Sequence, residues 1–182
     1  MNQARRKTLS ALDLYDLHEA LRSAHETARS ALERDDKVTP SVVLEVCQQV
    51  SKAGNDAGVA DYASGVVQAE AEAEQEGYDN LSEGLQQTER GRTMEEAAGC
   101  LQEATDSLYQ IVVDLSEAEK LCDELLEITE ATLIDEETDL FVWDEREEEH
   151  ARGLVENMLS LLSDAEADAL TAAEQVDQAV AC

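Results

Sequence analysis

Apolar residues recur at intervals of three and four along most of this chain, the spacing that places them on one face of an α-helix. The longest such stripe consists of Met94, Ala97, Leu101, Ala104, Leu108, Ile111, Leu115, Ala118, Cys122 and Leu125. A 3-4 repeat sustained over several heptads predicts a long helix that packs against a partner helix at a shallow angle. Thr93 and Glu96 have the spacing of a capping box, so we expect this helix to begin at Thr93.

Two shorter helical segments precede this stripe. The first has apolar residues at helical spacing from Leu9 to about Asp35. The second begins after Thr39, which together with Pro40 makes a good N-cap and first-turn pair. The run from Ala53 to Gly58 is rich in glycine, Asn and Asp, which favour turns, and it predicts a break before the pattern resumes up to Glu76.

The remaining segments are a connection and a final helix. Gly77 to Arg92 is polar and punctuated by glycine, so it predicts a structured connection. The final helix is predicted to begin near Arg146. Ser163 and Glu166 form another capping-box pair, which leaves open whether this helix continues or restarts there.

These segments predict an all-α fold, an elongated antiparallel helical bundle or coiled-coil hairpin with additional helices. Strands need frequent turn punctuation, whereas Pro40 is the only proline and only 3% of residues are aromatic. We expect a helical hairpin region at 1–134 with inserted helices at 39–76, and a C-terminal helical extension at 135–182.

The charge of the chain restricts its partners. Its 43 acidic residues outnumber 13 basic ones, which gives a formal net charge of -30. This field disfavours direct binding to nucleic acid or to an anionic membrane surface. No stretch approaches the ~20 apolar residues of a membrane span. The basic start, with Arg5, Arg6 and Lys7, leads into an amphipathic helix and not an apolar signal core, so we expect a cytoplasmic protein in a host cell.

No residues form a recognisable catalytic or cofactor site. The four cysteines, Cys47, Cys100, Cys122 and Cys182, include no Cys-x-x-Cys pair and have no histidine nearby, so neither zinc nor a disulfide framework is indicated. Cys47 and Cys122 fall on apolar faces, where a thiol usually serves as a small hydrophobic group. A nucleophile with its base and a glycine-rich phosphate loop are both missing, so we expect a protein that is not an enzyme and has no cofactor.

One pair of residues has the spacing of metal ligands. Glu147 and His150 form Glu-x-x-His, which on a helix places both side chains on one face, as in carboxylate-bridged di-iron bundles. The second such pair is missing, and His18 and His25 flank the apolar stripe of the first helix. A solvated charge cluster is therefore the favoured interpretation and no metal site is predicted, with a carboxylate metal bundle as an alternative.

A resemblance rests on a more specific motif. Residues 78–91 read Tyr-Asp-Asn-Leu-Ser-Glu-Gly-Leu-Gln-Gln-Thr-Glu-Arg-Gly, and Met94-Glu95 and a Leu-x-x-Ala-x-Asp-Ser-Leu stretch ending at Leu108 follow. This resembles short uncharacterised proteins of phages and bacterial mobile elements, which typically read Tyr-Glu-Asn-Leu-Pro-Glu-Ser-Leu-Gln-x-Ser-Glu-Arg-Gly. The chain departs from that pattern with Ser82 in place of the proline.

The opening of the chain, with Arg5, Arg6 and Lys7, is similar to the start of those proteins as well. The resemblance covers roughly the first helix and residues 76–110. It implies a helical hairpin and a viral or mobile-element origin, and it implies no activity.

Two groups of side chains are candidates for an interaction surface. The first group lies in the motif and contains Tyr78, Asn80, Leu81, Leu85, Gln86, Glu89 and Arg90. These side chains either hold the connection together or contact a partner. The second group is Phe141 and Trp143, the only phenylalanine and tryptophan, which either anchor a partner or cap the bundle core, the latter being favoured.

The sequence therefore predicts a non-enzymatic acidic helical interaction protein that binds and modulates a host or viral protein. Carboxylates along a helical rod could imitate DNA phosphates, which would make the partner a nucleic-acid-binding host enzyme and the protein an anti-defence inhibitor. Solubility or adaptation to high salt are alternative reasons for the charge. A self-assembling structural or scaffolding factor, a homo-oligomer, is the second class of function.

Overall fold

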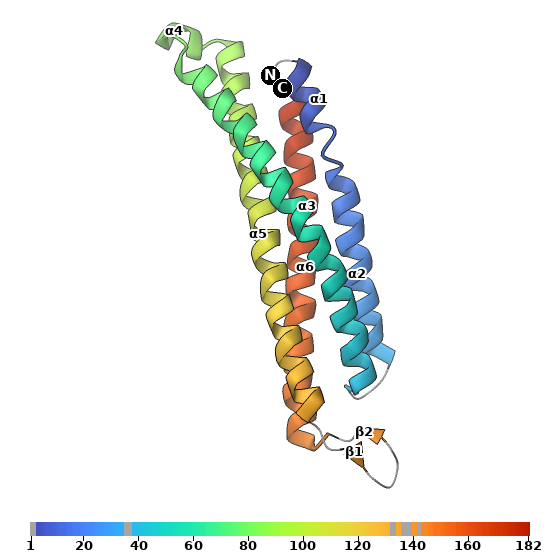
Figure 1. Cartoon of the computed structure of the whole chain (residues 1–182). Coiled ribbons are helices and arrows are strands. Elements are labelled where there is room, and N and C mark those ends of the chain that lie inside the picture. The colour runs from blue at the N-terminus through green and yellow to red at the C-terminus, as the bar shows by residue number, and fades with distance from the viewer. Residues whose placement is uncertain (1–2, 35–37, 132–133, 136–139, 142) are drawn as a thin grey trace. The chain divides into compact units, whose positions relative to one another are not determined.

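The computed structural model describes residues 3–34, 38–131, 134–135, 140–141 and 143–182 of the chain. The elements in chain order are α1 (Gln3–Leu9), α2 (Leu14–Arg34), α3 (Pro40–Asp79), α4 (Glu83–Gln86), α5 (Glu89–Ala131), β1 (Ile134–Asp135), β2 (Leu140–Phe141) and α6 (Glu145–Ala181) (Figure 1). The strands have two residues each and pair antiparallel, with Ile134 opposite Phe141. Almost all of the described chain is helical, which confirms the all-α class.

The chain forms two compact units, each assembled from separate segments. Unit 1 contains Met1–His18, Ala57–Val112 and Ala167–Cys182. Unit 2 contains Glu19–Asp56 and Val113–Glu166. The helices α2, α3, α5 and α6 each contribute to both units. The units are thus discontinuous in sequence.

In unit 1, α3 and α5 lie side by side and run in opposite directions (Figure 1). Gly77 near the end of α3 lies against the Met94 side chain near the start of α5. Small residues dominate the buried positions of α3 and α6, which allows close helix contact. The buried apolar residues are Leu9, Leu14, Leu17, Ala60, Ala63, Val67, Ala71, Ala97, Ala98, Cys100, Leu101, Ala104, Leu108, Ile111, Ala169, Ala172, Ala173, Val176 and Ala179.

In unit 2, the first part of α3 again runs antiparallel to α5, because Gly54 lies beside Glu119 and the Cys47 thiol is hydrogen-bonded with the Cys122 thiol. The side chains of α2 and α6 are joined by His25 Nδ1 and Glu166 Oε2, which are 2.8 Å apart. The buried apolar residues are Leu21, Ala24, Ala28, Ala31, Val38, Val42, Val43, Val46, Cys47, Val50, Ala53, Leu115, Ala118, Cys122, Leu125, Ala151, Leu154, Val155, Met158, Leu162 and Ala165.

The first predicted helix starts later than expected. Leu9 ends α1, and α2 begins only at Leu14. Between them Asp13 has a φ of 46°, a left-handed conformation that an α-helix cannot include. Its carbonyl oxygen accepts hydrogen bonds from the N–H groups of Asp16 and Leu17, so Asp13 starts the new helix. The apolar residues keep their helical spacing across the turn at Asp13, so their pattern does not show where the helix begins.

The predicted start of the second helix is confirmed, and the predicted break inside it is wrong. The helix α3 begins at Pro40, and Thr39 accepts a hydrogen bond from the Val42 N–H at its hydroxyl, with an N to Oγ1 distance of 3.4 Å. Positions 53–58 are helical. The Asn55 amide donates to the Ser51 carbonyl oxygen one turn back and so does not compete with the helix.

The long helix extends further than predicted at its start, so the predicted Thr93 cap is wrong. It begins at Glu89, and the Thr93 hydroxyl bonds to the Glu89 carbonyl oxygen inside the helix. The predicted stripe is buried except for the half-buried Met94. The final helix starts at Glu145, close to the predicted Arg146, and continues to Ala181. None of the described helices is long and apolar enough to cross a membrane.

Candidate interaction site

The chain reverses between α3 and α5 through residues 80–88, which include α4 and are called the connection below. The Gln86 side-chain amide donates to the Tyr78 carbonyl oxygen at 3.2 Å, which ties α4 back to the end of α3. Leu81 N–H donates to the same carbonyl at 3.0 Å. The side chain of Gln86 and the backbone of Tyr78 therefore hold the connection together, as one of the two predicted roles for the motif requires.

Thr88 and Gly91 fix the start of α5. The Thr88 carbonyl oxygen accepts from the Arg92 N–H at 3.1 Å, and its hydroxyl accepts from the Gly91 N–H at 3.4 Å. A Cβ atom added at Gly91 would lie 2.3 Å from the Gln86 carbonyl oxygen. Only glycine allows this approach of backbone to backbone. The Glu-Arg-Gly end of the motif thus has a structural reason for its glycine.

Several motif side chains remain exposed on this ordered backbone. Leu85 is 53% exposed, although a leucine in a folded protein is usually buried. Asn80, Glu89 and Arg90 are also exposed, whereas Tyr78, Leu81 and Gln86 are half-buried. The structure thus brings all seven predicted residues of the motif to one end of unit 1, with Leu85 as the largest apolar group open to solvent among them.

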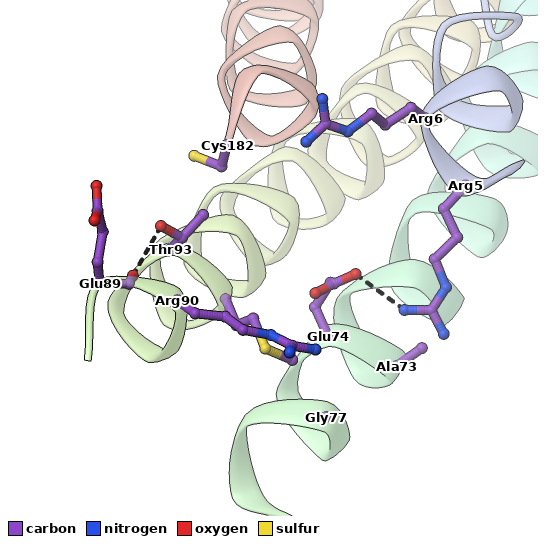
Figure 2. Close-up of a pocket in the computed structure, with 10 residues that line it drawn as sticks. Arg5, Arg6, Ala73, Glu74, Gly77, Glu89, Arg90, Thr93 and Cys182 are labelled. Atoms are coloured by element: carbon purple, nitrogen blue, oxygen red, sulfur yellow. Dashed lines mark hydrogen bonds and ion pairs between the residues drawn. The ribbon is translucent and has the colours of Figure 1, made fainter. Parts of the chain in front are cut away.

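A pocket of about 720 Å³ opens beside the start of α5 in unit 1 (Figure 2). Three arginines line this pocket, which is called the arginine pocket below. They come from the two parts of the chain that carry the resemblance: Arg5 and Arg6 from α1, and Arg90 from α5. Glu74 and Glu89 line it as well. The basic start of the chain and the motif are far apart in the sequence, and their common occurrence in the resemblance is the signal that could have paired them.

Arg5 forms ion pairs with two glutamates of α3. Its Nε lies 3.0 Å from Glu70 Oε2, and its Nη1 lies 3.0 Å from Glu74 Oε1. Glu74 is only 2% exposed, and a carboxylate so deeply buried needs a compensating cation. The pair joins α1 to α3 and fixes one wall of the pocket (Figure 2).

Arg6 and Arg90 differ from Arg5 in having no ion pair within the part of the chain that the structure describes. Figure 2 shows the Arg90 side chain extending across the pocket and the Arg6 guanidinium turned toward Cys182. A guanidinium offers a fork of donors that suits carboxylates and other planar acceptors. In a chain with a net charge of -30, two such groups that make no ion pair with the described residues are suited to an acceptor from outside.

The second predicted group belongs to unit 2. Phe141 is in β2, and its side chain lies outside the described part of the structure. Trp143 is half-buried and lines a pocket of about 510 Å³ with Glu148 and Arg152. Its indole Nε1 is buried and has no hydrogen-bond partner among the residues described. Trp143 is thus neither a fully exposed anchor nor a fully buried core residue.

Glu147 and His150 have separate roles. The Glu147 carboxylate accepts from the Asp144 N–H at 3.0 Å, and Asp144 Oδ1 accepts from the Glu147 N–H at 2.8 Å, which is a reciprocal capping box at the start of α6. His150 Nε2 lies 3.3 Å from Glu124 Oε1 in an exposed pair. Over the described ranges, no three His, Cys, Asp or Glu side chains are grouped so that they could hold a metal ion.

Comparison with known proteins gives no relative of this chain. No protein-family model matches the chain, and neither a curated protein nor a solved structure matches it significantly. The residues of the connection and the pocket are therefore the basis for any functional proposal.

Proposed function

We propose that this chain is a non-catalytic interaction protein of phage or mobile-element origin that binds and modulates a host or viral protein through the connection and the start of α5. The observation that carries this proposal is Leu85, 53% exposed on a backbone that its own hydrogen bonds hold in place. Exposed side chains on a rigid scaffold are typical of recognition surfaces, because little conformational entropy is lost on binding.

Arg90 supports the same surface. It is exposed beside the connection and makes no ion pair with the residues that the structure includes. An arginine next to an exposed leucine combines an apolar contact with a bidentate donor, and arginine is enriched among the residues that dominate binding energy. Leu85 and Arg90 are thus the two side chains that we expect to contribute most.

The net charge of -30 favours a partner with a basic surface. A nucleic-acid-binding enzyme of the host has such a surface, and occupation of its nucleic-acid groove by carboxylates would inhibit it. This sharper form of the proposal, DNA mimicry by an anti-defence protein, requires binding that weakens steeply as salt rises, because exposed charges are screened within ~10 Å at 0.1 M salt.

A pull-down of the tagged chain from host lysate at low and high salt, followed by mass spectrometry, tests the proposal. Leu85→Ala and Arg90→Ala should each weaken retention of the same protein by about tenfold, the size expected for a dominant interface residue. Leu44→Ala is the matched control for the leucine, since Leu44 is 50% exposed in unit 2. Arg29→Ala is the control for the arginine, since Arg29 is exposed and pairs with Glu33 one turn further along α2.

Three outcomes separate the forms of the proposal. A nucleic-acid-binding enzyme that is shed at high salt supports mimicry, and a partner retained at both salt concentrations supports a different protein target. Equal retention by Leu85→Ala, Arg90→Ala and their controls would place the binding surface elsewhere.

Self-association is a second candidate, and a pair of tyrosines favours it. Tyr62 in α3 is 69% exposed and Tyr109 in α5 is 64% exposed. Gly77 lies against Met94 on the same two antiparallel helices, and Tyr62 precedes Gly77 by as many residues as Tyr109 follows Met94. The two rings are therefore at the same level of unit 1, and paired exposed aromatic residues are typical of protein interfaces.

Sedimentation velocity of the purified chain distinguishes this candidate from the first. A dimer or larger species that dissociates in Tyr62→Ala/Tyr109→Ala and persists in Leu85→Ala supports assembly. A monomer over the whole concentration range rejects it.

A further inference from the structure

Three sulfur atoms from three different helices meet in the core of unit 2. Cys47 is in α3, Cys122 is in α5 and Met158 is in α6. The Cys122 thiol donates to the Met158 thioether with a sulfur-to-sulfur distance of 3.3 Å, and the Cys47 thiol lies within hydrogen-bonding reach of Cys122. Cys122 is therefore the middle member of the cluster, which we call the sulfur cluster.

The members of the sulfur cluster differ slightly in burial. Met158 is fully buried at 0% exposure, whereas Cys47 and Cys122 retain 8% and 7%. The side of the cluster formed by the two cysteines is therefore the one closer to solvent. Cys100 and Cys182 belong to unit 1, so the sulfur cluster contains both cysteines of unit 2.

We propose that the sulfur cluster is a binding site for a monovalent soft metal ion, Cu(I), with Cys47, Cys122 and Met158 as its ligands. Thiolates and thioethers are the ligands that Cu(I) prefers. Zinc is disfavoured because it takes four nitrogen, oxygen or thiolate ligands, and a thioether is not among its usual ones. Hard ions such as Mg²⁺ and Ca²⁺ require oxygen ligands, which do not form the cluster.

The distance between the Cys122 and Met158 sulfur atoms suits such an ion after a small adjustment. With about 2.3 Å as the scale of a metal–thiolate bond, three sulfur atoms around one ion in a plane lie about 4 Å apart. The Cys122 and Met158 sulfur atoms would have to separate from their present 3.3 Å by less than about 1 Å. Methionine has three rotatable side-chain bonds and can make this change without moving the helix.

The thiolate is the form of cysteine that binds metal. Binding involves no electron transfer: metal–sulfur bonds form, and thiol protons pass to solvent.

The sequence could not show this site. Cys47 and Cys122 are distant in the sequence and have no Cys-x-x-Cys neighbour, and Met158 lies in a third helix. The site is independent of the proposed protein-binding function, because none of its residues belongs to the connection or to the arginine pocket. Failure of either proposal leaves the other unaffected.

The test is anaerobic titration of the reduced full chain with Cu(I) in competition with a chromogenic Cu(I) chelator. We expect one ion per chain. Cys47→Ala and Cys122→Ala should each lower the affinity at least about 100-fold, because loss of even a second-shell partner costs 10–100-fold. Met158→Leu, which conserves volume, should lower it about tenfold while both thiols remain.

Two controls address other sources of binding. Cys100→Ala and Cys182→Ala should bind Cu(I) as the unmodified chain does, although Cys100 is buried as well. The Cys47→Ala/Cys122→Ala variant retains every surface carboxylate, so any ion that it still holds belongs to the acidic surface or to the other cysteines. Binding by this variant equal to that of the unmodified chain would overturn the proposal.

X-ray absorption at the copper edge of the unmodified loaded chain gives a result that does not depend on whether a variant folds. A first shell of three sulfur atoms supports the site. A shell that contains nitrogen or oxygen, or the absence of any retained copper, rejects it.

Discussion

Two segments of this chain combine glycine with Asn or Asp, and only one of them interrupts a helix. Residues 53–58 lie inside α3, whereas the chain reverses at residues 80–88 between α3 and α5. A glycine close to another part of the chain lies inside the first segment, and another lies just after the second. A Cβ atom at Gly54 would lie 2.1 Å from Glu119 Oε1, and one at Gly91 would lie 2.3 Å from the Gln86 carbonyl oxygen.

The difference between these contacts explains the difference between the segments. Glu119 is an exposed side chain whose carboxylate can move, so the glycine at Gly54 relieves a contact between two neighbouring helices. The Gln86 oxygen belongs to the backbone of the connection and cannot move without it. Gly54 in the first segment therefore serves helix packing, and Gly91 just after the second segment serves the reversal of the chain.

Proline should separate the two segments most strongly. Asn55→Pro places the ring within α3, where it removes a backbone donor and clashes with the preceding turn. We expect the free energy of unfolding to fall by about 3 kcal/mol or more. Asn55 is exposed, so no core packing is lost with it. Denaturant unfolding monitored by circular dichroism measures the change, and an unchanged midpoint would mean that α3 is broken there after all.

Gly91→Ala should have the next largest effect. The added methyl meets the Gln86 backbone, and strain of this kind typically costs 1–3 kcal/mol. We expect a net loss of about 2 kcal/mol in the free energy of unfolding, although alanine favours a helix. Gly99→Ala in the same helix is the control, because a Cβ there meets nothing within 4 Å. Equal stability of the two variants would show that the connection adapts.

Gly54→Ala should act in the opposite direction. Its methyl meets only the end of the Glu119 side chain, which can turn toward solvent. Alanine is favoured over glycine inside a helix, so the free energy of unfolding should rise by about 0.5–1 kcal/mol. A loss of stability that Glu119→Ala relieves in the double variant would show instead that the carboxylate is held in place.

Ser82→Pro should stabilise the connection. Ser82 has a φ of -64°, the value that proline imposes, and its side chain makes no capping hydrogen bond. Its N–H makes no hydrogen bond to the described residues, so proline removes none. We expect a gain of about 0.4–1 kcal/mol from the lower entropy of the unfolded chain. A loss would show that Leu81 cannot adopt the extended backbone needed before proline, and it would weaken the resemblance to proteins that have proline there.

These comparisons show which features the sequence could reveal. The stripe from Ala97 to Leu125 predicted α5 because burial follows the helical period directly. The break predicted at residues 53–58 is wrong because composition alone does not say whether a glycine forms a turn or packs against a neighbouring helix.

The residues that meet in the arginine pocket and in the sulfur cluster also could not be predicted from the sequence, because the fold brings them together. The arginine pocket joins Arg5 and Arg6 to Arg90, and the sulfur cluster joins Cys47 to Cys122. Both are set by the register of antiparallel helices, which no local pattern in a single sequence encodes. The residues of the connection could be predicted because they are contiguous.

The smallest expected effect concerns the carboxylate of Asp56, within residues 53–58. Burial in α3 raises the pKa of Asp56 above its ordinary value of 3.8, and Lys52 offsets only part of this. The protonated form is therefore favoured in the folded state, and the resulting stability is present at low pH and is lost as pH rises through the raised pKa. Asp56→Asn should match the unmodified chain near pH 3 and be more stable at pH 7, by less than about 1 kcal/mol because the side chain is partly solvated.

Asp61→Asn provides the control for Asp56→Asn, since it removes the same charge from an exposed position of the same helix. In a chain with a net charge of -30, loss of any carboxylate reduces self-repulsion, so both variants should gain some stability at pH 7. The excess gain of Asp56→Asn over Asp61→Asn, measured by unfolding from pH 3 to pH 7, isolates the effect of burial in the helix. No excess would mean that Asp56 is as solvated as it would be in a turn, and it would return residues 53–58 to the same class as the connection.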